Sequence, residues 1–241
     1  MKNIFSLYKL RMLMCFKNAI LVIPTVITAV FLGFMYSLKP SQISASFLIS
    51  GLFLFVLCVY ISMMIAAKEN DIQEQVLYLH CRSDVAYYIS RELVLLTICI
   101  MYSIIIIIYP VISAHYSSDF FTRALETSDI ILGGGLIFGN GLLGMAVGDF
   151  FHHRIIRMRR NAVLFLMLLI AVAICKFAII HAFSYFRYIS FLLPPVMDGF
   201  DMVGNSDIFD KTKTIYILIH VLLFVLAATI LKIGILKHKK Y

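Results

Sequence analysis

The sequence predicts an all-α integral membrane protein that folds as a single membrane domain over residues 1–241. Hydrophobic residues make up 62% of the chain and charged residues 14%, whereas an average soluble domain carries about 25% charge. The apolar residues gather in six runs of about 20 residues, each long enough to cross a bilayer core of about 30 Å as a helix. The segments between the runs are too short for a folded soluble domain. The six predicted spans cover about residues 19–37, 47–67, 93–114, 130–148, 162–181 and 214–232.

Residues 2–17 precede the first span and are predicted to form an interfacial helix. On a helical wheel its polar residues fall within an arc of about 120°, and most of the rest is apolar. These polar residues are Lys2, Asn3, Ser6, Lys9 and Lys17. Such a helix lies in the membrane surface with its lysines toward anionic headgroups. Arg11 stands on the apolar side, where we expect it to extend toward water or, alternatively, to contact another segment.

The charges are distributed unequally between the two predicted sides of the membrane. Most of the 21 Lys and Arg residues lie in the N-terminal segment, in 68–92, in 149–161 and in the C-terminal tail. Acidic residues gather in the other set of connections, 115–129 and 182–213. The positive-inside rule therefore predicts a multi-pass protein of a bacterial-type plasma membrane with both termini cytoplasmic. The net charge of +8 then reflects topology, and no nucleic-acid partner is expected.

The fourth span is rich in glycine. Gly135 and Gly139 form one GxxxG pair, and Gly144 and Gly148 form a second. Glycine at this spacing lets two helix backbones approach closely in lipid, either within one subunit or between two subunits. The run lacks the GK[ST] ending of a phosphate-binding loop, so no nucleotide site is predicted here.

The fifth span and the segment after it carry two further predictions. Lys176 is a charge within a span, and we expect it either to extend outward or to contact an acidic group on a substrate or a neighbouring helix. Segment 182–213 is interrupted by Pro194-Pro195, which cannot sit inside a regular helix. Two short, half-inserted elements at the outer face are therefore expected.

A polar island from Lys68 to Glu92 separates the second and third spans. It reads KENDIQEQVLYLHCRSDVAYYISRE, and its acidic start favours a helix. Ile72, Val76 and Leu79 recur at i, i+4 and i+7 and form one narrow apolar stripe. This pattern favours a helix at a water-filled interface with another protein, or an amphipathic surface helix without a partner. The basic loop 149–161 is either a topology anchor beside anionic lipid or a second contact surface, formed by His152, His153 and Arg154.

This order of elements resembles the permease subunit of type-2 ABC exporters, the ABC-2 type transporter family. The resemblance is most specific in AAKENDIQEQVLYLHCRSDVAYYISRELVLL. Glu69 matches an early glutamate of the family. Val76, Leu77 and Leu79 match an apolar turn, and Tyr87-Tyr88 with Arg91 match the start of the next span. The sequence departs from the family at Glu74-Gln75, which replaces a glycine-threonine pair, and at Arg82-Ser83, where a proline-containing turn is common.

The resemblance implies that the island is a coupling helix that docks on a separate ATP-binding subunit. The residues that it places in this contact are Glu69, Asp71, Ile72, Gln75, Val76, Leu79 and Arg82. ATP and Mg²⁺ would be held by the partner, so neither a cofactor nor enzyme activity is expected in this chain. A second permease subunit, identical or related, would complete the pathway for a hydrophobic or amphipathic cargo such as an antimicrobial or toxin-like peptide.

Two other classes of function are alternatives to transport driven by ATP. One is a membrane immunity or interaction protein that binds a peptide toxin without transporting it. The other is an ion channel, which requires a repeated polar stripe that the spans lack. The seven histidines form no HExxH motif and the five cysteines form no CxxC pair, so neither a metal site nor a disulfide framework is predicted.

Overall fold

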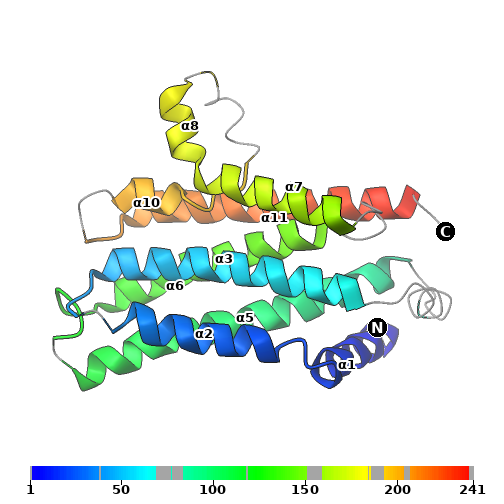
Figure 1. Ribbon diagram of the computed structural model, residues 1–241, viewed down its shortest axis with the longest axis horizontal. Coiled ribbons are helices and arrows are strands. Elements are labelled where there is room, and N and C mark those ends of the chain that lie inside the picture. Colours follow the sequence, from blue (N-terminus) through cyan, green and yellow to red (C-terminus); the bar gives the residue numbers. More distant parts are fainter. Residues whose placement is uncertain are drawn as a thin grey trace.

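A computed structural model of the chain describes residues 2–37, 39–68, 77, 84–117, 119–150, 159–183, 185, 193–203 and 207–238 (Figure 1). The fold is all-helical over these residues. In chain order the helices are α1 (Lys2–Lys17), α2 (Val22–Met35), α3 (Ile43–Lys68), α5 (Asp84–Tyr116), α6 (Thr127–Phe150), α7 (Arg159–Ile174), α8 (Lys176–Ala182), α10 (Asp198–Val203) and α11 (Lys211–His238).

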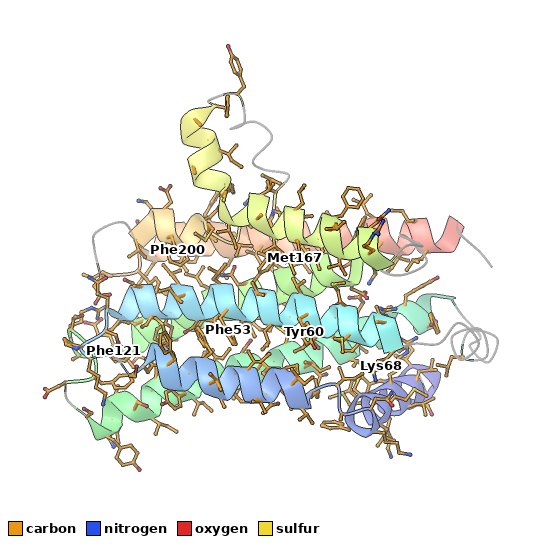
Figure 2. All side chains as sticks on the ribbon, in the orientation of Figure 1. Phe53, Tyr60, Lys68, Phe121, Met167 and Phe200 are labelled. Carbon is orange, nitrogen blue, oxygen red and sulfur yellow. The ribbon has the colours of Figure 1, made fainter. Side chains whose placement is uncertain are left out.

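The long helices run side by side and define two ends of the bundle. α1 begins and α11 ends at one of them, which we call the terminal end, and the opposite one is the distal end (Figure 1). In Figure 2, Lys68 lies at the terminal end and Phe121 at the distal end. Residues 69–83 connect α3 to α5, and residues 151–158 connect α6 to α7. The four helix ends that border these two segments lie at the terminal end.

Four helices are long and apolar enough to cross a membrane, namely α3, α5, α6 and α11. α1 and α2 meet at an angle of 69° and would add a fifth crossing if the bent pair forms one span. The chain is therefore a helical membrane protein, as the composition predicts. Six crossings are not established, because α2 has only 14 residues and α7 only 16.

The predicted span 162–181 is not one continuous helix. α7 ends at Ile174, and α8 begins at Lys176 and turns away from the bundle (Figure 1). At 1.5 Å per residue α7 is about 24 Å long, less than the thickness of a bilayer core. α10 follows Pro194-Pro195 and is one short element within the segment 182–213. α8 lies almost entirely within the predicted span 162–181, and most residues between Ala182 and the prolines lie outside the described part of the chain, so the second short element stays a prediction.

The packing core lies between α3 and α6, and glycines allow it. A Cβ atom on Gly144 would clash with the carbonyl oxygen of Phe55, and one on Gly148 would lie 2.7 Å from the carbonyl oxygen of Val59. The other predicted pair packs differently, because a Cβ on Gly135 would meet only the end of the Leu218 side chain on α11, at 3.3 Å. Gly139 also faces α11. Both GxxxG pairs thus have neighbours within the same chain.

α1 packs across the first turns of α5. The hydroxyls of Tyr8 and Thr97 are 3.1 Å apart, and the guanidinium of Arg11 lies 4.5 Å from the centre of the Tyr87 ring. Arg11 is 4% exposed, so it does not extend to water. Of the two alternatives, the structure therefore shows Arg11 in contact with another segment. A cation over an aromatic face is stabilised where solvent is excluded.

Polar contacts join three connections at the distal end. Asp207 accepts hydrogen bonds from the backbone amides of Ile43 and Ser44, which begin α3, and from the hydroxyls of Ser44 and Thr122. Burial alone would raise the pKa of Asp207, but these hydrogen bonds favour the carboxylate and hold its pKa below the ordinary value. Arg123 forms a two-pronged contact with Asp129 at 2.7 and 2.8 Å.

Candidate functional site

The residues that the sequence assigns to coupling lie outside the described part of the chain. These are Glu69, Asp71, Ile72, Gln75, Val76, Leu79 and Arg82 in the polar island, and His152, His153 and Arg154 in the basic loop. The described helices nevertheless show where both segments attach. Residues 69–83 of the island connect the end of α3 at Lys68 to the start of α5 at Asp84. The basic loop connects the end of α6 to the start of α7. All four attachment points are at the terminal end (Figure 1).

Four charged side chains from three helices meet just inside these attachment points. We call this group, Arg91 and Glu92 of α5, Asp149 of α6 and Lys232 of α11, the charge cluster. The Lys232 ammonium donates hydrogen bonds to both Glu92 Oε1 and Asp149 Oδ2. Arg91 Nη2 lies 2.5 Å from Asp149 Oδ1. The two positive and two negative charges balance.

The charge cluster is buried. The side chain of Asp149 is 1% exposed, and those of Arg91 and Lys232 are 5% exposed, whereas Glu92 keeps 27% of its side chain accessible. Burying an isolated charge costs many kcal/mol, so such groups occur inside proteins only when oppositely charged groups contact them. The three helices are therefore tied together by contacts that cannot be broken singly without a large cost.

The local sequence explains how each side chain reaches the cluster. Arg91 and Glu92 are consecutive on α5, and their side chains point about 100° apart. One turn of α5 can therefore contact both α6 and α11. Asp149 follows Gly148, whose close approach to Val59 fixes the end of α6 against α3. Lys232 lies six residues before the end of α11. Its long aliphatic stem spans the gap between α11 and α6.

A small aromatic cluster lies about one helical turn from the charge cluster, toward the start of α5 and the end of α11. Tyr87 and Tyr88 pack edge to face with ring centres 5.3 Å apart, and they form one hydrophobic cluster with Leu236 at the end of α11. Leu77, the one described residue of 69–83, packs against this same group. Leu77 therefore makes a hydrophobic contact with the start of α5 and the end of α11, about one helical turn from the charge cluster.

Lys176 forms a second buried ion pair, far from the first. Its ammonium lies 2.7 Å from Asp198 Oδ1 of α10, and the Lys176 side chain is 6% exposed. Nδ1 of His220 on α11 lies 3.9 Å from the other oxygen of Asp198. Of the contacts expected for Lys176, the structure shows the one to an acidic group on a neighbouring helix. This pair joins α8, α10 and α11 where α7 breaks.

Sequence reasoning did not identify the charge cluster, because each member stands at the edge of an apolar run. Asp149 directly follows the fourth predicted span, Glu92 directly precedes the third, and Lys232 ends the sixth. Charges at such positions are ordinarily taken as topology anchors at the membrane surface. The signal that could have revealed the cluster is that two acids and two bases stand at the same predicted depth on three spans.

The charge cluster ties three helices together through ion pairs. Among the residues that the structure describes, no three His, Cys, Asp or Glu side chains are grouped so that they could hold a metal ion. The charge cluster joins the helices that flank the polar island and the basic loop. A displacement of either segment would be carried into the bundle through paired, buried charges.

No family model, no curated protein and no solved structure matches the chain.

Proposed function

We propose that the chain is the permease subunit of an ATP-driven exporter of the ABC-2 type. A separate ATP-binding subunit holds ATP and Mg²⁺ and hydrolyses the nucleotide, and this chain is not itself an enzyme. The cargo is hydrophobic or amphipathic, for example an antimicrobial or toxin-like peptide, and is moved out of the cell. The order of elements and the polar segment between α3 and α5 support the proposal.

In this proposal the chain crosses a bacterial-type plasma membrane six times, with α2 as the first crossing and α7 as the fifth. α1 lies on the cytoplasmic surface, and both termini are cytoplasmic. A helix as short as α7 requires local thinning of the bilayer, which membranes permit at modest cost. A second permease subunit, identical or related, completes the pathway. α11 supports such a contact because apolar side chains such as Ile219, Leu223 and Leu226 are exposed along it.

The observation that carries the proposal is the position of the charge cluster. It ties α5, which follows the island, to α6, which precedes the basic loop, and to α11. Docking of an ATP-binding subunit on 69–83 and 151–158 would move α5 and α6 at their terminal ends. The buried charges transmit that movement to α11, since separating them would leave charges unpaired in an apolar interior.

The charge distribution of the island provides a direct test of coupling. The full chain is reconstituted with the ATP-binding subunit encoded by its neighbouring genes, and cargo-stimulated ATP hydrolysis is measured. Glu69→Lys combined with Asp71→Lys should lower the stimulation roughly tenfold, because coupling between two sites is typically worth 5- to 150-fold. The matched control is Glu126→Lys combined with Asp201→Lys, which reverses two exposed acids outside the terminal end.

The two double variants separate transport from the competing function. If cargo stimulated ATP hydrolysis equally in the two double variants, the island would have no role in coupling. A protein that sequesters a peptide toxin without transport would protect cells normally with either double variant, because it needs no ATP-binding partner. Loss of membrane insertion is checked by the amount of full-length chain recovered from the membrane fraction.

A further inference from the structure

A small cavity with both apolar and basic lining residues lies at the terminal end where α1 meets α3 and α5. Its volume is about 40 Å³. A buried water needs about 10–15 Å³ by the same measure, so the cavity has room for about three waters or for one small oxyanion. The lining residues are Arg11, Met14, Cys15, Asn18, Ile20, Ile65, Lys68, Arg91 and Val94.

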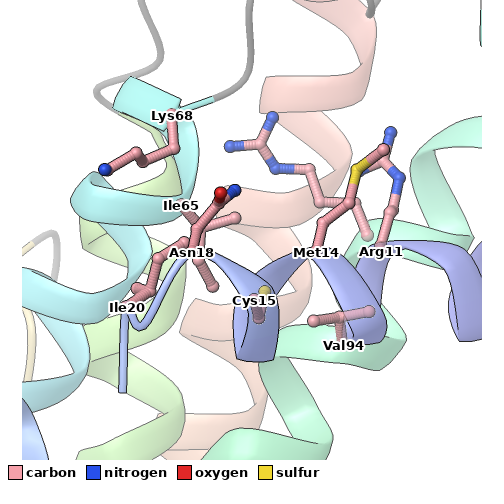
Figure 3. Close-up of a pocket in the computed structure, with 9 residues that line it drawn as sticks. Arg11, Met14, Cys15, Asn18, Ile20, Ile65, Lys68 and Val94 are labelled. Atoms are coloured by element: carbon pink, nitrogen blue, oxygen red, sulfur yellow. The ribbon is translucent and has the colours of Figure 1, made fainter. Parts of the chain in front are cut away.

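The cavity is lined by basic side chains on one side. Figure 3 shows the polar ends of Arg11, Asn18 and Lys68 on the same side, with Cys15 and Val94 on the opposite side. Of the described residues that line it, three are cationic and none is acidic. Arg11 and Arg91 are each only 4% exposed. Positive charge concentrated in a poorly hydrated recess favours an anionic ligand.

The backbone around the cavity places it at the height of a membrane surface. α1 and α2 meet at 69°, the geometry of a helix lying along a surface followed by one entering the membrane. Phosphates of lipid headgroups lie at that boundary. Asn18 comes from the connection after α1, and Lys68 is the last residue of α3.

Exposed apolar side chains beside the cavity favour a lipid over a soluble anion. On α1 the side chains of Phe5 and Phe16 are 70% and 55% exposed. Val22 and Val26 at the start of α2 are also exposed. These surfaces offer contact for acyl chains below a bound headgroup, whereas a soluble phosphate would gain nothing from them.

We propose that this cavity binds the phosphate of an anionic phospholipid headgroup. Arg11 and Lys68 supply the positive charge, Arg91 lines the cavity while its charge is paired with Asp149, and the side-chain amide of Asn18 donates a hydrogen bond to a phosphate oxygen. A lipid of net negative charge is selected over a zwitterionic one, since the latter carries its own compensating cation. The bound lipid joins α1 to α3 and α5. This inference stands independently of the transport proposal.

Retention of defined lipids by the purified full-length chain tests the site. Phosphatidylglycerol, phosphatidylcholine and inorganic phosphate are the three probes, and native mass spectrometry and thermal unfolding are the readouts. The variant is Arg11→Gln combined with Lys68→Gln. The control, Lys9→Gln combined with Lys17→Gln, removes two exposed charges from α1 that do not line the cavity.

The proposal predicts that phosphatidylglycerol binds the unmodified chain and the control alike. In the cavity variant its affinity falls by roughly fivefold for each basic residue removed. Phosphatidylcholine and inorganic phosphate should bind weakly throughout. Equal affinity for phosphatidylglycerol in the cavity variant and the control would overturn the site, and inorganic phosphate stabilising the chain as strongly as the lipid would overturn the lipid assignment. If the double variant does not fold, Lys68→Gln decides alone, because Lys68 is exposed and its replacement leaves the packing intact.

Discussion

At the scale of single residues, the charge cluster is the most constrained feature of the described chain. Lys232 is shared by two carboxylates, and Asp149 is shared by two cations. Lys232 and Asp149 therefore link Glu92 to Arg91 in one continuous chain of ion pairs. Removing one member exposes the others to an apolar environment, so single substitutions are expected to be far more damaging than paired ones.

Lys232→Met tests this dependence. It leaves two carboxylates facing one guanidinium, and we expect it to lower the free energy of unfolding by about 3–5 kcal/mol. Denaturant titration or thermal unfolding of the purified protein in detergent measures the change. Lys211→Met, at the exposed start of the same helix, serves as the control and should have little effect.

Removing an acid together with the lysine completes this test. In Lys232→Met combined with Glu92→Gln, the charges of Arg91 and Asp149 balance again, and part of the stability should return. A double variant whose loss equals the sum of the two single losses would show that Lys232 and Glu92 do not interact.

The sequence shows which charged residues stand in unusual surroundings, but it does not show which residues they contact. Arg11 and Lys176 stand out as charges in apolar surroundings, and both could be identified from their neighbours in the chain. Their partners, Tyr87 and Asp198, come from segments far away in sequence or across a proline break. Helical periodicity contains no information on such tertiary contacts, so extension toward water was an equally reasonable expectation.

At the scale of elements, α6 fixes how closely the bundle packs. The glycines of its two GxxxG pairs face two different helices, Gly144 and Gly148 toward α3 and Gly135 and Gly139 toward α11. On the α3 side the obstacle to a larger residue is backbone, which cannot move alone. On the α11 side it is the tip of a leucine side chain, which can rotate away.

The two GxxxG pairs should therefore respond differently to alanine. Gly144→Ala forces α3 and α6 apart and should destabilise the protein by about 1–3 kcal/mol, the range for overpacked cores. Gly135→Ala, which meets only Leu218, should be close to neutral. Thermal unfolding of the two variants in the same detergent compares them. Equal destabilisation would mean that the pairs share one packing role.

Four predicted spans coincide with long helices because an uninterrupted apolar run leaves few alternatives to a helix in lipid. They are 47–67, 93–114, 130–148 and 214–232, within α3, α5, α6 and α11. The run 162–181 is equally apolar, yet its helix breaks at Cys175. Lys176 turns there toward Asp198, which lies beyond Pro194-Pro195. That ion pair could not be read from the apolar run itself.

At the scale of the whole molecule, the helix ends that border residues 69–83 and 151–158 share one end of the bundle with the start of α1 and the end of α11 (Figure 1). The buried charge cluster and the basic cavity lie at that same end. The distal end instead holds the acidic connections, which are joined by the hydrogen bonds of Asp207 and Arg123. In the proposed function, the terminal end is the side on which the ATP-binding subunit would dock.

The central claim is that a separate ATP-binding subunit drives this chain. Its most direct test is purification of the affinity-tagged full-length chain from membranes of cells that also express the neighbouring genes, followed by measurement of ATP hydrolysis. We predict that an ATP-binding subunit co-purifies in a fixed ratio and hydrolyses ATP in the purified assembly. Recovery of the chain alone, from cells in which such a subunit is present, would contradict the account.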